Sequence, residues 1–266
     1  MKQSVLRIEH LSKTYGKRMV IKDISMIARQ GESVGLLGPN GAGKTTAFYC
    51  ITGQLAATGG QIFLNPQDTP RASAFDLWMS SPMPMVTLTK TFDITHIHKA
   101  SKKRHIKLNA LLCWCIGNAA SQVEEFYMLP IEGKMYQFDS IAINVIVNNK
   151  KGGISSCDIP YTNDFNRFYE DYIRLTQSVS ESCESTFIED AMIIGTSAVV
   201  ATELDCIVNQ YTDKFLNPMV MWGKYRQSWF KTTLPISFQF HHVQMDGGHG
   251  ALFLDILQKE MKKLKL

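Results

Sequence analysis

The most constraining feature of the sequence is a strand-like segment near the C-terminal end that stops at two histidines and a glycine-rich turn. Residues 234–242 alternate apolar and polar side chains, as a half-buried β-strand does. His242 falls on the apolar side, where the strand is expected to end. Asp246 and Gly247 follow in the turn, and apolar residues at helical spacing come next. The pattern predicts a strand, a sharp turn and a helix.

A histidine at the end of an apolar strand is well placed to act as a base, because imidazole titrates near neutral pH. A single histidine in such a place is more often a satisfied core residue. Here the whole pattern His-His-x-x-x-Asp-Gly adds a carboxylate four residues after His242 and a glycine that lets the backbone turn sharply. The combination favours the catalytic interpretation.

The surroundings of this motif resemble the chloramphenicol acetyltransferase family. The order and spacing of several segments carry the likeness, namely 70–75, 138–140, 160–161, 164–169, 218–225, 234–236 and 241–247. The resemblance covers about Asn65 to Lys262. It implies an α/β fold, an α+β two-layer sandwich in which helices pack on a mixed sheet.

The resemblance also implies an activity and a catalytic loop. In this family the histidine that matches His242 is the general base, and it takes a proton from the acceptor hydroxyl as that oxygen attacks acetyl-CoA in a direct ternary complex. Asp246 is expected to pair with Arg71 and to fix the loop, a task that suits a bidentate Arg–carboxylate pair. The family's active site lies between the subunits of a homotrimer. The acceptor is a small hydroxylated molecule, chloramphenicol or another.

Three further residues take their expected roles from the same resemblance. Ser197 matches the serine whose hydroxyl stabilises the oxyanion, although an ordinary strand serine remains the alternative because only Ser-Ala matches locally. Lys224 and Tyr225 match the region that lines the coenzyme A channel. The sequence departs from the family over 199–205 and at Met221, where a threonine is expected. Because specificity depends on pocket contacts, these departures leave the acceptor open.

Leu77 and Trp78 stand where aromatic contacts with the acceptor are expected. The altered pocket is compatible with acetyl transfer to a hydroxyl group. It gives no support to chloramphenicol over any other acceptor.

A different motif occupies the N-terminal part of the chain. Residues 4–20 are typical of a strand, a turn at Gly16 and a second strand, and residues 32–37 predict a short apolar strand. The phosphate-loop pattern Gly-x-x-x-x-Gly-Lys-Thr follows directly at 38–45. Its glycines let backbone amides surround phosphates, while the lysine neutralises the β and γ oxygens and the threonine ligates magnesium. The candidate nucleotide-binding residues are Gly38, Gly41, Gly43, Lys44, Thr45 and Thr46.

This segment resembles the start of ABC-transporter ATPases, especially the lipopolysaccharide-export type, as far as about Leu64. In that family the residue that matches Tyr15 stacks on adenine. Residues 66–266 contain none of the other motifs that such an ATPase needs: the signature sequence, the Asp-Glu strand end, the glutamine loop and the switch histidine. The predicted organisation is an incomplete ABC ATPase-like segment over 1–65 and an acetyltransferase-like domain over 66–266. We expect the first segment to pack poorly, and ATP and magnesium are possible ligands only at this loop.

Charge and cysteine content limit the classes of ligand and partner that we expect for this chain. Residues 1–65 hold 8 Lys and Arg against 3 Asp and Glu, whereas residues 66–266 hold 20 against 21. The scattered basic residues do not form a nucleic-acid-binding arm. No apolar run approaches the length of a membrane span, and no secretory signal is visible. The six cysteines form no CxxC pair, so we expect free thiols, no metal site and a reducing cytoplasm.

Three functions remain after these observations. The leading one is an acetyl-CoA-dependent O-acetyltransferase with an inert ATPase-like leader. The second is an ATP-binding module that regulates something through residues 1–65. The third is a trimeric protein that binds a small molecule on an acetyltransferase scaffold without catalysis.

Overall fold

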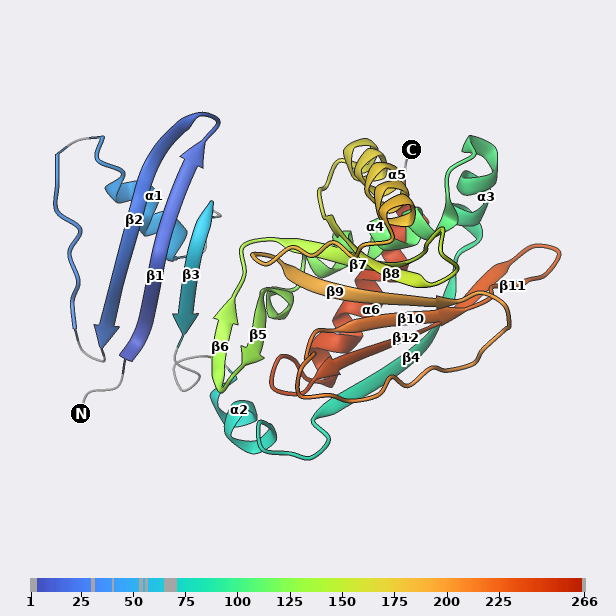
Figure 1. The fold of residues 1–266 in the computed structure, drawn as a ribbon. Helices are drawn as coiled ribbons and strands as arrows, with labels where there is room; N and C mark the ends of the chain where they lie inside the picture. The colour runs from blue at the N-terminus through green and yellow to red at the C-terminus, as the bar shows by residue number, and fades with distance from the viewer. Residues whose placement is uncertain are drawn as a thin grey trace.

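A mixed seven-stranded sheet forms the centre of the larger part of the molecule (Figure 1). The computed structural model describes residues 4–29, 32–39, 41–52, 55, 57–64 and 71–264. The strand order is β11-β12-β10-β9-β7-β8, and β4 pairs with β12. The strand β9 is parallel to β7 and β10, and the remaining pairs are antiparallel. The strands are β4 (Met85–Asp93), β7 (Ile141–Asn148), β8 (Ile154–Pro160), β9 (Met192–Val199), β10 (Met219–Gly223), β11 (Arg226–Gln227) and β12 (Thr232–His241).

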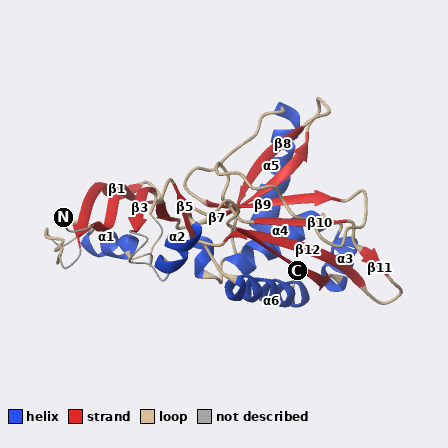
Figure 2. Ribbon diagram, turned by 90° about the horizontal axis from the view of Figure 1, so that it is seen from below, coloured by secondary structure: helices blue, strands red, loops and turns tan. Residues whose placement is uncertain are grey.

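Helices cover this sheet and complete the two-layer α/β fold that the sequence predicts. Figure 2 shows α6 (Gly247–Lys263) lying along one face of the sheet, where it packs against β4. The helix α4 (Leu108–Ala120) is apolar on all sides and contacts α3 (Thr95–Arg104), α5 (Phe165–Ser182) and α6. A helix with this composition is stable only when it is buried. No described helix is long and apolar enough to cross a bilayer.

The strand β12 is buried on both faces, so the prediction of a half-buried strand is wrong. Its polar side chains Ser237 and Gln239 are as inaccessible as its apolar ones. Threonines of β4 bond to both side chains, and the Ile207 amide donates to Ser237 Oγ. Segments that are distant in sequence therefore supply partners to these buried polar side chains, which an alternating pattern cannot reveal. The strand also ends at His241, which leaves His242 in the turn.

A second, antiparallel sheet contains the N-terminal segment (Figure 1). Its order is β2-β1-β3-β6-β5, and its strands are β1 (Ser4–Tyr15), β2 (Arg18–Arg29), β3 (Gly59–Leu64), β5 (Met128–Ile131) and β6 (Lys134–Gln137). The predicted strand, turn and strand over 4–20 are confirmed, with Gly16 at a φ of 57°. The helix α1 (Lys44–Ile51) contacts β1 and β2. A small core forms from Ile8, Leu11, Ile21, Ala47, Cys50 and Ile62.

The apolar strand expected at 32–37 is absent from the structure. Residues 32–39 have no regular secondary structure, and Leu37 is 97% exposed. The strand is central in a complete ATPase, where parallel neighbours pair with it on both sides. No such neighbours are present among the described residues, and the backbone therefore stays irregular. The expectation of poor packing applies to this stretch, whereas β1, β2 and α1 enclose a core of their own.

The strand β3 joins the two parts of the chain. Ile62 pairs with Ile8 of β1 on one side and with Gln137 of β6 on the other. The amide of Ala57 donates to Asp139 Oδ2 at 2.9 Å, which adds a contact just before the strand. The predicted boundary between residues 65 and 66 lies outside the described residues.

Candidate active site

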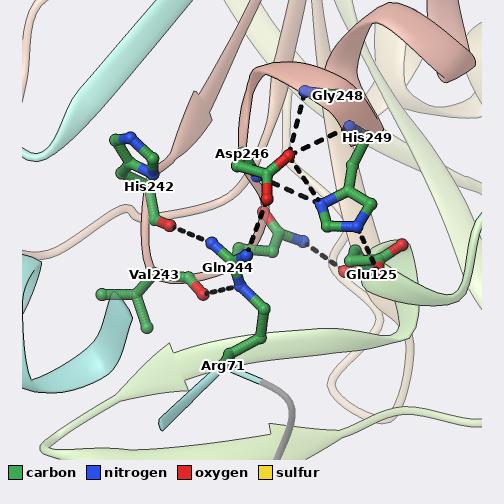
Figure 3. A network of polar contacts seen from close by, with 8 residues as sticks. All are labelled: Arg71, Glu125, His242, Val243, Gln244, Asp246, Gly248 and His249. Atoms are coloured by element: carbon green, nitrogen blue, oxygen red, sulfur yellow. Dashed lines mark hydrogen bonds and ion pairs between the residues drawn. The ribbon is translucent and has the colours of Figure 1, made fainter. Parts of the chain in front are cut away.

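His242 occupies the turn that connects β12 to α6. Its backbone amide donates to the carbonyl of Pro84 at 2.7 Å. Its imidazole stacks on Trp78, the last residue of α2 (Ala72–Trp78), with ring centroids 4.6 Å apart and planes 6° from parallel. The ring nitrogen Nδ1 is buried and has no partner among the described residues. Figure 3 shows the imidazole directed away from the polar contacts of its own turn.

Arg71 holds that turn at three points (Figure 3). The guanidinium donates from Nη2 to the carbonyl of His242 at 2.6 Å and from Nε to the carbonyl of Val243 at 3.0 Å. Nη1 lies 3.1 Å from Asp246 Oδ2. Arg71 is only 8% exposed, whereas the side chain of Asp246 is 44% exposed, so the bond to the carbonyl of Val243 is better shielded from water than the ion pair. A planar guanidinium with five donors is suited to such a fixed set of acceptors.

Asp246 caps the first turn of α6. Its Oδ1 accepts hydrogen bonds from the amides of Gly248 at 2.9 Å and His249 at 3.3 Å. Burial raises the pKa of this carboxyl, but the two amides, the His249 ring and Arg71 outweigh burial and leave the pKa below its usual value. The carboxylate therefore stays ionised and ties Arg71 to the start of the helix.

Two residues of this network have no role in the sequence-based prediction. His249 Nε2 lies 3.1 Å from Glu125 Oε1, and His249 Nδ1 accepts from the amide of Asp246 at 3.3 Å. The spacing Asp-x-x-His matches the capping box, in which the third helical residue reaches back to the capping amide. That spacing is a signal for His249. Glu125 is too distant in sequence for any such pattern.

The neighbouring histidine, His241, is a structural acceptor. It is 1% exposed, and its Nδ1 accepts from the amide of Val243 at 3.1 Å. Burial, with a smaller contribution from the charge of His242, lowers the pKa of His241 to about 4. The ring is therefore neutral at physiological pH, and the two adjacent histidines stand in different environments.

The other predicted site residues lie elsewhere on the sheet. Ser197 of β9 pairs with Met221 of β10, which pairs with Ser237 of β12. At about 3.3 Å of rise per residue, His242 is on the order of 16 Å further along β12 than Ser237. Within one chain, Ser197 is therefore separated from His242 by that distance and by two strand spacings.

Lys224 and Tyr225 follow β10 at the end of the sheet opposite to His242. The register places Trp222 beside Ile236, so the chain after β10 runs toward the start of β12. Lys224 is exposed, whereas Tyr225 is half-buried against the ring of His98 in α3, with centroids 4.7 Å apart. The structure thus brings together Arg71, His242 and Asp246, but not the other three predicted residues.

The phosphate loop leads into α1, which contacts β1 and β2 of the N-terminal sheet. Figures 1 and 2 show α1 beside β1 and away from α6. Gly41 and Gly43 both have a φ of 84°, a left-handed conformation that glycine adopts without strain. Lys44 Nζ donates to the loop's own carbonyls at Gly38 and Pro39, each at 2.7 Å. Among the residues that the structure describes, no carboxylate forms an ion pair with Lys44.

Cysteines and potential metal ligands are dispersed. All six cysteines are free, and Cys113 and Cys115 are fully buried in α4. Burial raises the pKa of Cys113 to about 12, so its thiol is unreactive at neutral pH. In the described part of the chain, no three side chains of the metal-binding types cluster together.

The fold and this turn define an acyltransferase. A solved chloramphenicol acetyltransferase matches 75% of this chain and 98% of its own length, with a TM-score of 0.66 and 17% identity. The truncated catalytic core of a 2-oxoacid dehydrogenase complex from Thermoplasma acidophilum matches with a TM-score of 0.55 and 14% identity, covering 73% of this chain and 95% of that one. At these identities the structures show the shared fold.

A family model described as chloramphenicol acetyltransferase matches residues 64–258. The chain belongs to this family.

The N-terminal segment matches a different group of proteins. A probable ABC transporter ATP-binding protein of Azorhizobium caulinodans is 51% identical over 75 residues, which are 28% of this chain and 23% of that protein. A lipopolysaccharide export ATP-binding protein, LptB, of Acidithiobacillus ferridurans is 48% identical over 64 residues, or 24% and 27% of the two chains. The chain thus spans about a quarter of the length of these relatives.

Proposed function

We propose that this protein transfers an acetyl group from acetyl-CoA to a hydroxyl group of a small molecule, with His242 as the general base. The observation that carries the proposal is the clamp of Arg71 on the carbonyls of His242 and Val243 and on Asp246. It fixes the backbone of the turn while the side chain stacks on Trp78. A base held by both its backbone and its ring is preorganised for one direction of proton transfer.

The proposed reaction uses the second ring nitrogen of His242, Nε2. Because Nδ1 of His242 is buried, Nε2 is the nitrogen that receives the proton of the acceptor hydroxyl. The acceptor oxygen then attacks the thioester carbonyl and forms a tetrahedral intermediate in a direct ternary complex. When the intermediate collapses, the carbon–sulfur bond breaks and the protonated His242 returns its proton to the sulfur of coenzyme A. No acyl-enzyme is formed.

The oxyanion donor in this proposal comes from a second copy of the chain. Ser197 is too far from His242 to act on the same carbonyl within one subunit, given the register through Met221. A homotrimer whose active site lies between subunits would bring Ser197 of a neighbouring copy to the intermediate. Loss of such a hydroxyl donor typically costs on the order of a hundredfold in kcat.

The coenzyme is proposed to lie along the end of the sheet that carries Lys224 and Tyr225 in the neighbouring copy that supplies Ser197, because within one chain that end is opposite to His242. Tyr225 contacts α3 through His98, and the last turn of α3 carries Lys102, Lys103 and Arg104. Coenzyme A is polyanionic, and cations on the helix that Tyr225 contacts suit its phosphates. We place the reaction in the cytoplasm, where the free thiols of this chain stay reduced.

Thiol release from acetyl-CoA across a panel of hydroxylated antibiotics, chloramphenicol included, tests the activity and the acceptor together. We expect acceptor-dependent release by the parent protein and a loss of on the order of a thousandfold in His242→Ala, since general-base catalysis contributes roughly that much. Full activity of His242→Ala with every acceptor that the parent uses would refute the proposal. Tight acceptor binding without turnover in the parent would instead support the non-catalytic binder.

A second candidate function, nucleotide binding at the phosphate loop, rests on the left-handed Gly41 and Gly43 before α1. Amides arranged in this way can hold phosphate oxygens if Lys44 releases its two carbonyl partners. A fluorescent ATP analogue tests this candidate. Binding that is lost in Lys44→Ala would support it, and equal signals from the two proteins would eliminate it.

A further inference from the structure

The catalytic turn has a second anchor on the side opposite to Arg71, formed by His249 and Glu125 (Figure 3). The first anchor, Arg71, binds Asp246 Oδ2 and the carbonyls before it. The second binds the backbone amide of Asp246 through His249 Nδ1, at 3.3 Å. The other ring nitrogen of His249 lies 3.1 Å from Glu125 Oε1. Asp246 is thus held between two independent sets of partners.

The partners of the two ring nitrogens of His249 explain why Glu125 matters. Glu125 Oε1 is a carboxylate acceptor, so the ring nitrogen that faces it, Nε2, carries a proton. The other nitrogen, Nδ1, lies 3.3 Å from the amide of Asp246 and 3.2 Å from Asp246 Oδ1. The first contact calls for a lone pair on Nδ1 and the second for a proton. In either state Glu125 sets the direction of the ring and thereby holds Nδ1 against Asp246.

Glu125 is itself firmly placed. It lies in the short 3-10 helix Glu124–Tyr127, and its side chain is only 18% exposed. Its carbonyl accepts from Gln244 Nε2 at 3.0 Å, and Gln244 is fully buried in the turn after His242. The same residue thus contacts the catalytic turn through its backbone at Gln244 and through its side chain at His249.

We propose that His249 and Glu125 are positioning residues, which fix the turn of His242 through the amide of Asp246 and through Gln244. This inference rests on the proposed function, because it assigns the pair a role in aligning the base. Neither residue needs to touch acetyl-CoA or the acceptor. Removing the pair should therefore lower kcat while the KM values for both substrates stay within about twofold of the parent.

Four variants and one matched control test the proposal by steady-state kinetics. His249→Ala and Glu125→Ala should each lower kcat on the order of ten- to a hundredfold, as small misplacements of catalytic groups do. His249→Gln should recover most of the activity, because glutamine is a usual partner in a capping box. The double variant should be no worse than His249→Ala, because the two residues act as a unit. The control is His96→Ala, which removes an exposed histidine whose ring contacts the carbonyl of Leu264.

Each rate is divided by the fraction of chains that bind coenzyme A, which separates positioning from loss of folded protein. The proposal is overturned if His249→Ala keeps the parental kcat. It is also overturned if the loss disappears after this correction, or if His249→Gln is no better than His249→Ala. Those results would leave the pair with a purely structural role.

A spectroscopic measurement tests the contact between His249 and Glu125 without using the reaction. In protein labelled with 15N-histidine, the signals of His249 are those that His249→Gln removes. We expect Nε2 to carry a proton at neutral pH in the parent, and Glu125→Ala to lower the fraction of rings protonated at Nε2. An unprotonated Nε2 in the parent would refute the inference. If the parent instead releases no thiol with any acceptor, the proposed function fails, and the protonation of Nε2 still shows whether the second anchor exists.

Discussion

Arg71 shows how one side chain can fix the backbone of the turn that carries His242. Arg71 donates to two consecutive carbonyls of the turn and to the carboxylate of Asp246. The expected pairing of Arg71 with Asp246 is present in the structure. The contacts with the carbonyls of His242 and Val243 go beyond any pattern in the sequence, since backbone acceptors leave no signature in residue types.

Replacing this arginine with lysine should disable the clamp although the charge is retained. A single ammonium group cannot reach three acceptors that a planar fork of nitrogens serves. We expect Arg71→Lys to lower the free energy of unfolding by about 2–4 kcal/mol, because buried carbonyls lose their donors. The value of kcat should fall on the order of tenfold or more.

Thermal unfolding and thiol release measure these two effects of Arg71→Lys. The matched control is Arg167→Lys on the exposed surface of α5, which should leave both unchanged. Parental stability and rate in Arg71→Lys would show that the charge alone matters at this position.

At the scale of elements, the strand, turn and helix that contain the motif could be predicted because their signals are local. Alternation over 234–242, the turn glycine and the helical spacing after it are read within one short stretch. The failures have non-local causes. Burial of β12 on both faces depends on the segment around Ile207, and the missing strand at 32–37 depends on parallel neighbours that the described chain does not supply. Glu125 enters the site only through tertiary contact with His249.

The burial of β12 predicts a specific pH dependence of stability. His241 at the end of β12 has a pKa lowered to about 4, whereas an unfolded histidine has a pKa of about 6.5. Between these two values the unfolded chain binds more protons, so the free energy of unfolding falls as the pH falls from about 6.5 to 4. Above that window His241 contributes no slope.

The variant His241→Asn keeps an acceptor for the amide of Val243 and removes the titrating ring. We expect its stability to depend less steeply on pH between about 6.5 and 4 than that of the parent. Urea unfolding at a series of pH values measures the slope. Identical slopes in the two proteins would mean that another group accounts for the acid sensitivity of the fold. His96→Ala serves as the comparison for the loss of an exposed histidine.

At the scale of the whole molecule, β3 decides how the two parts of the chain are connected. The family model begins at residue 64, and the ABC-type relatives match only a short N-terminal stretch. The strand between them nevertheless pairs with both β1 and β6, so one continuous sheet contains strands from both parts. We therefore propose that the acetyltransferase unit includes β3 and starts before residue 59, earlier than the division at 65 and 66 that the sequence predicts.

Two shortened chains test this boundary. A chain that begins at residue 57 keeps β3 and the bond from Ala57 to Asp139, whereas a chain that begins at residue 66 leaves the edge of β6 unpaired. We expect the longer chain to retain the thermal stability of the acetyltransferase unit, and the shorter one to unfold at a lower temperature and to aggregate, as exposed strand edges do. Equal stability and solubility of the two chains would place the boundary at the later position.

Limited proteolysis of the intact protein gives an independent answer. The stretch 32–39 has no regular structure and exposes Leu37, so the first cleavage should fall there. Because β3 is paired on both sides, a protease should not reach residues 59–64 while the sheet is intact. A first cut within 65–70 would contradict this view, since it would separate β3 from the unit that it is proposed to complete. A first cut in 32–39 would mean that the irregular stretch before α1, and not the junction at β3, is the site most open to proteolysis.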